Sequence, residues 1–173
     1  MDFFMPDKYY KSIYDINYID LKNNGIKCLL FDLDNTIVPP NEKKPNKKIH
    51  DLFDNLKELD FKVIIMSNSP KKRLSPFKDE LIIDCSATSM KPLKKKFNKI
   101  LKEYKLDLSQ TAIIGDQLMT DIFGGNRIGI TTILVNPISK KDFKVTTINR
   151  KLEHIVESKL EKRNLFKRGR YYE

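Results

Sequence analysis

Cysteine, histidine and long apolar runs are scarce in this chain of 173 residues. The two cysteines, Cys28 and Cys85, lie in or beside short apolar segments, where we expect buried thiols and neither a disulfide nor a metal pair. The two histidines, His50 and His154, lie far apart within helical patterns and look like ordinary helix residues. Chemistry centred on cysteine or histidine is therefore disfavoured.

No segment approaches the roughly 18 apolar residues of a helix that spans a membrane. Residues 1–16 mix acids and lysines with aromatic residues and lack the apolar centre of a signal peptide. We therefore expect the protein to stay in the cytosol and to meet a membrane only as a peripheral protein on its inner face.

The composition is that of a globular protein, with 40% hydrophobic and 32% charged residues. The length favours one domain over residues 1–173, with a core at about 26–136 and a basic amphipathic extension at about 140–173. Residues 140–173 contribute +6 of the net charge of +10. This excess favours an anionic partner, either phospholipid or nucleic acid, although a merely solvated basic tail is an alternative.

Short apolar runs alternate with amphipathic helical patterns along most of the chain. The alternation predicts βαβ units, and hence an α/β, Rossmann-like fold with a mainly parallel sheet of about five strands and helices on both faces. The expected strands are 26–31, 61–66, 81–84, 111–115 and 131–135, and the clearest helical patterns are 49–59, 93–104 and 118–123.

Polar residues follow several of the expected strands at the point where each strand ends. Because the carboxyl ends of parallel strands meet at one edge of a sheet, and ligands bind outside that edge, we expect these side chains to converge. The residues concerned are Asp32, Asp34, Ser67, Asn68, Lys91 and Asp116.

Carboxylates combined with a lysine and a serine are typical of a site for Mg²⁺ and phosphate. Asp32 and Asp116 would be metal ligands, a backbone carbonyl near Asp34 would be a third, and Asp121 would support a metal-bound water. An aspartate that attacks a phosphate meets a repulsion of about 4 kcal/mol for unit charges 4 Å apart at an effective dielectric of 20. A divalent cation and the ammonium of Lys91 would offset it.

Two acids two positions apart suit covalent phosphate hydrolysis. Asp32 would attack phosphorus and become an aspartyl phosphate, which splits one difficult step into two easier ones. Asp34 would protonate the leaving group and later deprotonate the attacking water. Ser67, Asn68 and Lys91 would bind the phosphate, and Thr36 would orient the acids from within the loop.

Four segments resemble the motifs of the haloacid dehalogenase-like (HAD) phosphohydrolases, in the usual order. They are "FDLDNT" (31–36), "MSNS" (66–69), "MKP" (90–92) and "IGDQLMTD" (114–121). The resemblance spans about residues 26–136 and implies that Asp32 is the nucleophile and Asp34 the general acid and base. It also implies phosphate binding by Ser67 and Lys91, and a Mg²⁺ ligand at Asp116 supported by Asp121.

The match is closest to the YqeG-type branch of subfamily IIIA, through "GDQLMTDIFGGNRIGITTILV" and "PDKYYKSIYDI". Fungal and plant members of that branch are phosphatidylglycerophosphate phosphatases, so the resemblance implies a lipid phosphate as substrate. Ser69 stands where relatives often carry asparagine, and the resemblance gives it no role.

The spacing of the motifs leaves no room for a cap domain. Only 28 residues, 35–62, separate Asp34 from Val63, and only 22 separate Asn68 from Lys91. We therefore expect an open site, which suits a phosphate on a large or surface-bound molecule. A phosphatase for nucleic-acid ends or phosphoproteins fits an open, basic site equally well.

A non-catalytic phosphoacceptor, such as a receiver-like module, would use similar residues. Such a module needs no proton donor two positions after the acceptor, so Asp34 favours turnover.

The basic C-terminal segment offers a route to a membrane surface. An apolar stripe is expected on one face of a helix in this segment, and basic residues near an anionic leaflet are worth about 1 kcal/mol each. Attachment would be weak unless aromatic residues also insert, and packing of the stripe on the core is the alternative. The stripe is Ile148, Leu152, Ile155, Val156 and Leu160, and the aromatic residues are Phe166, Tyr171 and Tyr172.

Overall fold

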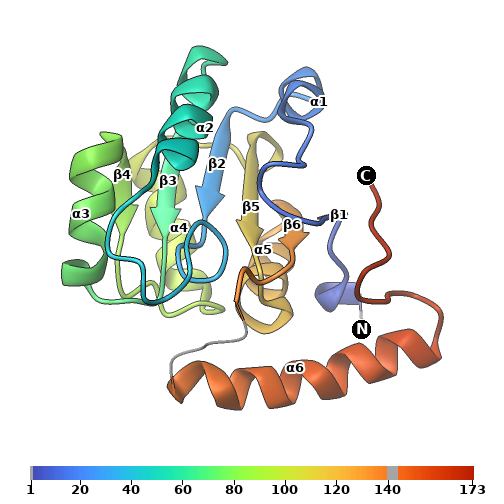
Figure 1. Cartoon of the computed structure of the whole chain (residues 1–173). Coiled ribbons are helices and arrows are strands. Elements are labelled where there is room, and N and C mark those ends of the chain that lie inside the picture. The colour runs from blue at the N-terminus through green and yellow to red at the C-terminus, as the bar shows by residue number, and fades with distance from the viewer. Residues whose placement is uncertain (1, 140–143) are drawn as a thin grey trace.

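A computed structural model describes residues 2–139 and 144–173. Its centre is a fully parallel sheet of six strands in the order β1-β6-β5-β2-β3-β4 (Figure 1). The predicted Rossmann-like α/β fold is confirmed, with one strand more than expected, and the described residues contain no cap domain. The strands are β1 (Lys8–Tyr10), β2 (Cys28–Phe31), β3 (Lys62–Met66), β4 (Asp84–Ser86), β5 (Thr111–Gly115) and β6 (Thr131–Val135).

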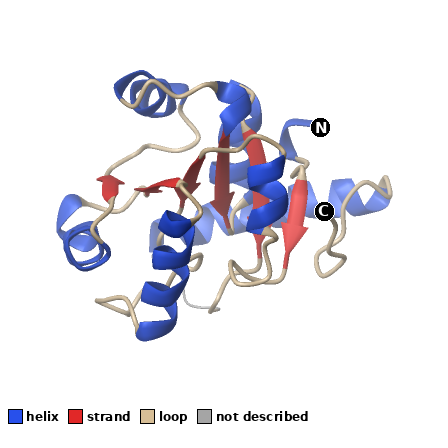
Figure 2. Cartoon of the chain, turned by 90° about the horizontal axis from the view of Figure 1, so that it is seen from above, coloured by secondary structure: helices blue, strands red, loops and turns tan. Residues whose placement is uncertain are grey.

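Helices cover both faces of the sheet (Figure 2). The first three, on one face, contribute apolar side chains to the largest core cluster, and α4 packs on the opposite face. The helices are α1 (Tyr18–Asn23), α2 (Lys47–Glu58), α3 (Lys71–Leu81), α4 (Lys94–Glu103), α5 (Phe123–Ile128) and α6 (Lys144–Lys162). Shorter turns are η1 (Asp2–Phe4), η2 (Leu108–Gln110) and the π-helical η3 (Leu118–Ile122).

The central strand β2 shows why the sheet lies between two helical layers. All four of its residues are fully buried, as expected for a parallel strand covered on both faces. Leu29 and Phe31 belong to the cluster with α1, α2 and α3, whereas Cys28 and Leu30 belong to the cluster with α4. This alternation fixes which side chains reach each layer.

The two cysteines are free thiols. Cys28 is fully buried, and burial raises its pKa to about 12. Cys85, on the edge strand β4, is only partly buried, which differs from the expected buried thiol because its side chain lines a cleft between α3 and α4.

The end of the chain packs against its beginning. Phe166 is 4% exposed, and Tyr172 pairs with Tyr9 of β1 in an antiparallel bridge with both backbone hydrogen bonds formed. The aromatic side chains of Phe166 and Tyr172 therefore pack with the third core cluster, around Tyr9 and Leu160, which is the packing alternative to their insertion into a membrane. Tyr171 remains 44% exposed.

The predicted apolar stripe of α6 is only partly buried. Leu160 is fully buried and Val156 packs on the same cluster, whereas Leu152 and Ile155 are 46% and 53% exposed. The side chain of Ile148 lies outside the described residues. In the part of the chain that the structure describes, no helix has the length and apolar character needed to cross a bilayer.

Parallel strands direct all their carboxyl ends to one edge of the sheet, which is the lower edge in Figure 1. The loops after β2, β3, β4 and β5 gather there. Helix α6 crosses below this edge and contacts η3, which directly follows the loop after β5. The C-terminal segment therefore lies close to the place where ligands bind in such sheets.

Candidate active site

Three aspartates come together at this edge of the sheet. Each of Asp32, Asp116 and Asp121 offers a carboxylate oxygen, and these oxygens all lie within 4.8 Å of one another. Asp32 is 7% exposed, and the other two are completely buried. We call these three residues the acidic cluster. Asp32 and Asp116 are the metal ligands predicted from the sequence, and Asp121 is the residue predicted to support a metal-bound water.

The ends of two adjacent strands position the cluster. The backbone N–H of Asp32 donates to the Ile114 carbonyl at 2.9 Å, so the pairing of β2 with β5 continues one residue beyond β2. Asp116 follows Gly115 at the end of β5. A Cβ atom at Gly115 would lie only 2.2 Å from Cγ of Asp121, so glycine is the residue that leaves room for this carboxylate.

Lys91 supplies the positive charge of the site. Its Nζ lies 2.6 Å from Asp32 Oδ1 and 2.6 Å from Asp121 Oδ1, and its side chain is only 1% exposed. Asn68 holds the backbone of Lys91: its Oδ1 accepts from the Lys91 N–H at 2.7 Å, and its Nδ2 donates to the Lys91 carbonyl at 3.1 Å. The Asn68 side chain thus positions Lys91, and phosphate binding by Asn68 would fall to its backbone.

Burial controls the protonation of this cluster. Loss of water raises the pKa of Asp32 to about 8; the charges of Asp121 and Asp116 act in the same direction, and Lys91 opposes them. For Lys91, burial disfavours the charged form, but Asp121 and Asp32 outweigh burial and raise its pKa above the ordinary value. Three carboxylates beside one ammonium leave an excess of buried negative charge, which a divalent cation would neutralise.

The carboxylate of Asp34 points to different partners. Arg73 donates to Asp34 Oδ1 from Nε at 3.1 Å and from Nη2 at 2.8 Å, and Ser69 Oγ donates to Oδ2 at 2.6 Å. Asp34 is therefore not a member of the acidic cluster by its side chain. A role of Asp34 in metal binding would depend on a backbone carbonyl, as predicted from the sequence.

Thr36 and Ser67 are the remaining predicted site residues, and both are buried. Thr36 is 2% exposed and donates from Oγ1 to Asp116 Oδ1 at 3.2 Å, which agrees with a role in orienting an acid. Ser67, also 2% exposed, directly follows β3, and its Oγ accepts from the Ser69 N–H at 3.1 Å. The structure thus brings all eight predicted site residues to one edge of the sheet, with Asp34 facing Arg73.

Four further residues near the site are not predictable as site residues from the sequence. Arg73 and Ser69 contact Asp34, as described above. Arg168 donates from Nη2 to the Asp116 carbonyl at 3.4 Å and to Glu153 Oε1 at 3.3 Å, and Glu153 in turn accepts from the Leu118 N–H. Both arginines lie in segments crowded with lysines, so composition alone does not distinguish them from surface charges.

Known proteins are similar to this chain in sequence or in fold. A family model described as HAD-hydrolase-like matches residues 90–159. The "Probable phosphatase YqeG" of Bacillus subtilis (strain 168) is 36% identical over 161 residues, which cover 93% of this chain and 94% of the relative. "Phosphatidylglycerophosphate phosphatase 1, chloroplastic/mitochondrial" of Arabidopsis thaliana is 26% identical over 143 residues, or 76% of this chain, but the match spans only 41% of its length.

A solved structure agrees with the fold. The HAD-hydrolase YfnB of Bacillus subtilis, described as bound to magnesium, has a TM-score of 0.52 and 18% sequence identity. The superposition covers 69% of this chain and 90% of that chain. The superposition shows that the two proteins share a fold, and with an identity this low the comparison shows the fold alone.

Proposed function

The chain belongs to the haloacid dehalogenase-like hydrolases, in the branch of the phosphatase YqeG, and on this premise we propose that it is a Mg²⁺-dependent phosphomonoesterase acting through an aspartyl phosphate. Its activity as a phosphatase follows from that relationship. The observation that carries the mechanism is the position of the Asp32 carboxylate, beside two further carboxylates and the Lys91 ammonium.

The residues present fit a magnesium ion. Asp32, Asp116 and Asp121 form an oxygen donor set, directly or through water, and the backbone carbonyl near Asp34 completes it. Mg²⁺ bound there would neutralise the excess carboxylate charge and stabilise the charge on the phosphate oxygens. The magnesium described for YfnB is consistent with this choice of metal.

The first step would transfer the phosphoryl group to the protein. Asp32 forms a bond to phosphorus as the bond to the ester oxygen breaks, and Asp34 gives a proton to that leaving oxygen. Lys91, held against Asp32, would stabilise the negative charge of the transferring group together with Ser67 and the backbone N–H of Asn68. In the second step a water molecule gives a proton to Asp34 and attacks phosphorus, and the Asp32–phosphorus bond breaks.

The surroundings of Asp34 suit this role as a proton carrier. Its two oxygens have different partners, since Arg73 binds Oδ1 and the Ser69 hydroxyl donates to Oδ2. The Oδ2 atom can exchange the Ser69 hydroxyl for the leaving oxygen while Arg73 keeps the carboxylate in place. Asp34 therefore favours turnover over the receiver-like alternative, which would require only the phosphoacceptor Asp32.

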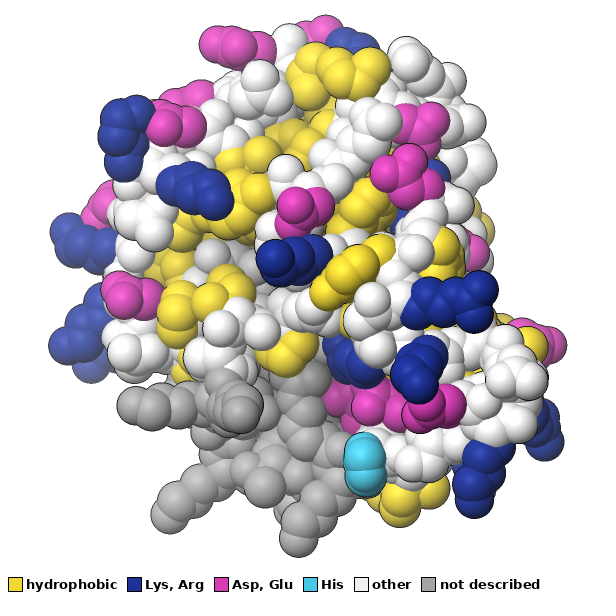
Figure 3. Space-filling model, turned by 45° about the vertical axis from the view of Figure 1, so that its right-hand side comes forward, with side chains coloured by type: hydrophobic (Ala, Val, Ile, Leu, Met, Phe, Trp, Pro, Cys, Tyr) yellow, Lys and Arg dark blue, Asp and Glu magenta, His cyan; other side chains and the backbone are white. Residues whose placement is uncertain are grey.

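A lipid phosphate, phosphatidylglycerophosphate, is the proposed substrate. The Arabidopsis relative carries that activity in its name, although this chain spans less than half of its length. The absence of a cap domain, in the described part of the chain, leaves the site open to a large substrate. On the face shown in Figure 3, Lys and Arg side chains lie over the C-terminal segment with acidic side chains among them, so attraction to an anionic leaflet would be modest.

The basic composition equally suits a phosphatase for nucleic-acid ends or phosphoproteins. One experiment decides which of these substrates the protein hydrolyses. Phosphate release with Mg²⁺ is measured on phosphatidylglycerophosphate in detergent micelles, on 5′-phosphorylated oligonucleotides and on a phosphopeptide, with Asp32→Asn as the blank. We expect the micellar lipid to give the highest kcat/KM. Turnover of oligonucleotide or phosphopeptide without lipid turnover would reject the lipid substrate and retain the phosphatase.

The mechanism has its own test. Asp34→Asn should abolish steady-state hydrolysis, because the leaving oxygen then lacks a proton donor. A variant that kept near-full activity would show that the assigned proton carrier is wrong, whichever substrate is used.

A further inference from the structure

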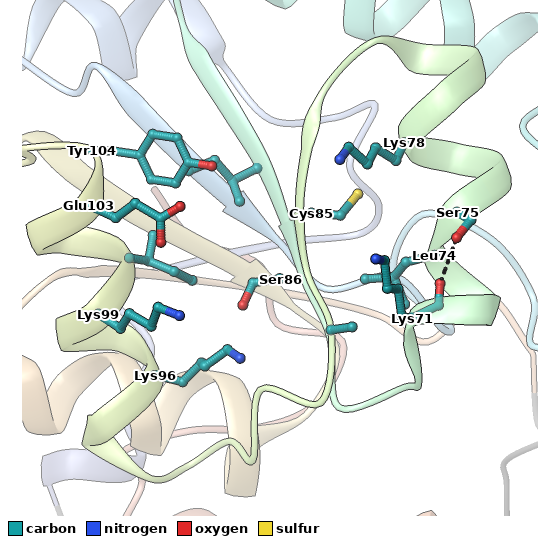
Figure 4. A pocket seen from close by; sticks show the side chains of 13 residues that line it. Lys71, Leu74, Ser75, Lys78, Cys85, Ser86, Lys96, Lys99, Glu103 and Tyr104 are labelled. Atoms are coloured by element: carbon teal, nitrogen blue, oxygen red, sulfur yellow. Dashed lines mark hydrogen bonds between the residues drawn. The ribbon is translucent and has the colours of Figure 1, made fainter.

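A basic cleft lies at the side of the sheet, between helices α3 and α4 and over the edge strand β4 (Figure 4). Its volume is about 310 Å³. Lys71 and Lys78 line it from α3, and Lys96 and Lys99 line it from α4. Figure 4 shows the four ammonium groups directed toward the space between the two helices. None of the residues assigned to catalysis lines this cleft.

The four lysines lack the partners that neutralise other lysines of this protein. Within residues 2–139 and 144–173, none of the four forms an ion pair, whereas nearby Lys57 pairs with Asp54. The one carboxylate among the lining residues is that of Glu103. The lining thus carries a net charge of +3 around a small hollow.

Like charges that face one another across a cleft reinforce each other's field and raise the local concentration of counter-ions. We propose that this cleft is a second anion-binding site, which takes a soluble compound with phosphate groups. The ammonium groups would contact the phosphate oxygens as point charges, and the hydroxyl of Ser86 offers a hydrogen bond. The Ser75 hydroxyl already donates to the Lys71 carbonyl at 3.0 Å. The volume is at the lower end for ligand pockets, so a group the size of a pyrophosphate or sugar phosphate fits.

The cleft is connected to the catalytic edge through the sheet. The Ser86 carbonyl accepts from the N–H of Ser67, the residue proposed to bind the scissile phosphate, at 3.0 Å. A ligand in the cleft would therefore lie one strand away from that loop. The site is nevertheless separate from the acidic cluster, and its binding can be tested without catalysis.

The test is a titration with inorganic pyrophosphate, followed by amide chemical shifts in ¹H–¹⁵N NMR spectra. EDTA removes divalent cations, so the excess negative charge of the acidic cluster repels the probe. We expect saturable shifts at the cleft amides, such as those of Ser75 and Ser86, and little change at Leu33 and Asn35. The spectra also report whether each variant remains folded.

A pair of double variants on the same helix gives the matched control. Lys96→Gln with Lys99→Gln removes two charges from the cleft, and Lys95→Gln with Lys102→Gln removes two exposed charges of α4 outside it. We expect the dissociation constant to rise about tenfold or more for the first pair and less than about twofold for the second.

Equal weakening in both double variants would show attraction to the basic surface in general and would overturn the proposal. Shifts that do not saturate, or that fall only at the catalytic edge, would overturn it as well. Because no turnover is measured, failure of the proposed phosphatase mechanism would leave this result unaffected.

Discussion

Arg73 binds Asp34 through two donors, Nε and Nη2, which both reach the same carboxylate oxygen, Oδ1. Both side chains are largely sheltered from water, with 14% and 13% of their surfaces exposed. The guanidinium plane therefore fixes the direction of the carboxylate and leaves Oδ2 for the Ser69 hydroxyl. A proton carrier that must serve two successive steps benefits from such a fixed position.

Arg73→Ala should lower kcat by roughly 10- to 100-fold, because a catalytic group displaced by about an ångström loses that much rate. Steady-state kinetics with a small phosphate ester measure the effect. Lys72→Ala, at the exposed neighbouring position, is the control and should keep the parent kcat. Arg73→Lys should restore only part of the loss, since a lysine cannot offer two donors in one plane. Unchanged kcat in Arg73→Ala would disprove the positioning role.

The pKa of Asp32 predicts how the metal-free protein responds to pH. Burial raises this pKa to about 8 in the folded chain, whereas the ordinary value of 3.8 applies when the chain is unfolded. Between these values the folded state binds more protons than the unfolded state. Raising the pH therefore lowers the free energy of unfolding, by up to about 1.4 kcal/mol per pH unit.

Urea unfolding in EDTA between pH 5 and pH 8 measures this loss of stability. Asp32→Asn lacks the titrating carboxyl, so its free energy of unfolding should fall less than that of the parent over the same range. Asp79→Asn, at an exposed position, should follow the parent. If all three proteins lost the same stability, the Asp32 carboxyl would not be the group that titrates. Added Mg²⁺ should stabilise the parent more at pH 8 than at pH 5.

Strand ends made much of this site predictable from the sequence. Apolar runs covered on both faces are a strong signal, and four of the five expected strands correspond to β2, β3, β5 and β6. The expected strand 81–84 is misplaced, because Leu81 still belongs to α3 and the partly buried β4 begins only at Asp84. Parallel strands share one carboxyl edge, so the residues that follow them are expected to lie close together. The structure shows this for Asp32, Lys91 and Asp116. The same reasoning could not find β1, whose three residues, Lys8–Tyr10, are held by pairing with β6 and with Tyr172.

The partners of the site residues were not predictable in this way. Arg73 reaches Asp34 from a helix that starts after a different strand, and Arg168 reaches Asp116 across 52 positions of the chain. Neither contact follows from a local pattern, because each depends on how a helix or a terminal segment packs. The sequence leaves the aromatic C-terminus open for the same reason: Phe166 could insert into a membrane or pack on the core, and the structure shows it buried against Tyr9.

Gly115→Ala tests the close packing behind the acidic cluster. The three nearest heavy atoms to the added Cβ, at 2.2–2.5 Å, all belong to Asp121. Asp121 cannot move easily, because it also binds Lys91 and accepts from the Gln117 N–H at 3.2 Å. We expect a loss of about 1–3 kcal/mol in the free energy of unfolding, as in other overpacked cores, together with weaker Mg²⁺ binding.

A double-mutant cycle identifies Asp121 as the cause of that loss. In an Asp121→Gly background the clashing atoms are absent, so adding Gly115→Ala should cost little further stability in urea unfolding. An equal loss in both backgrounds would place the strain elsewhere in the loop after β5.

Arg168 connects the C-terminal segment to the loop that carries Asp116. Its Nη2 donates to the Asp116 carbonyl and to Glu153, and its Nε donates to Glu157 Oε1 at 2.6 Å. Glu153 is 2% exposed and binds the Leu118 N–H, just beyond Asp116. The segment thus orients the proposed metal loop through a partly buried, charged hydrogen-bond network.

Removal of Arg168 should therefore weaken metal binding more than it changes the chemical step. In Arg168→Ala, the Mg²⁺ concentration for half-maximal activity should rise about 10- to 100-fold, as found for residues that orient metal ligands, while kcat at saturating Mg²⁺ stays near the parent value. Arg170→Ala removes the same charge from an exposed position two residues away and should leave the Mg²⁺ dependence unchanged. Equal Mg²⁺ curves for the two variants would mean that the C-terminal segment only stabilises the fold, because a loss of general stability would lower activity without shifting the metal requirement.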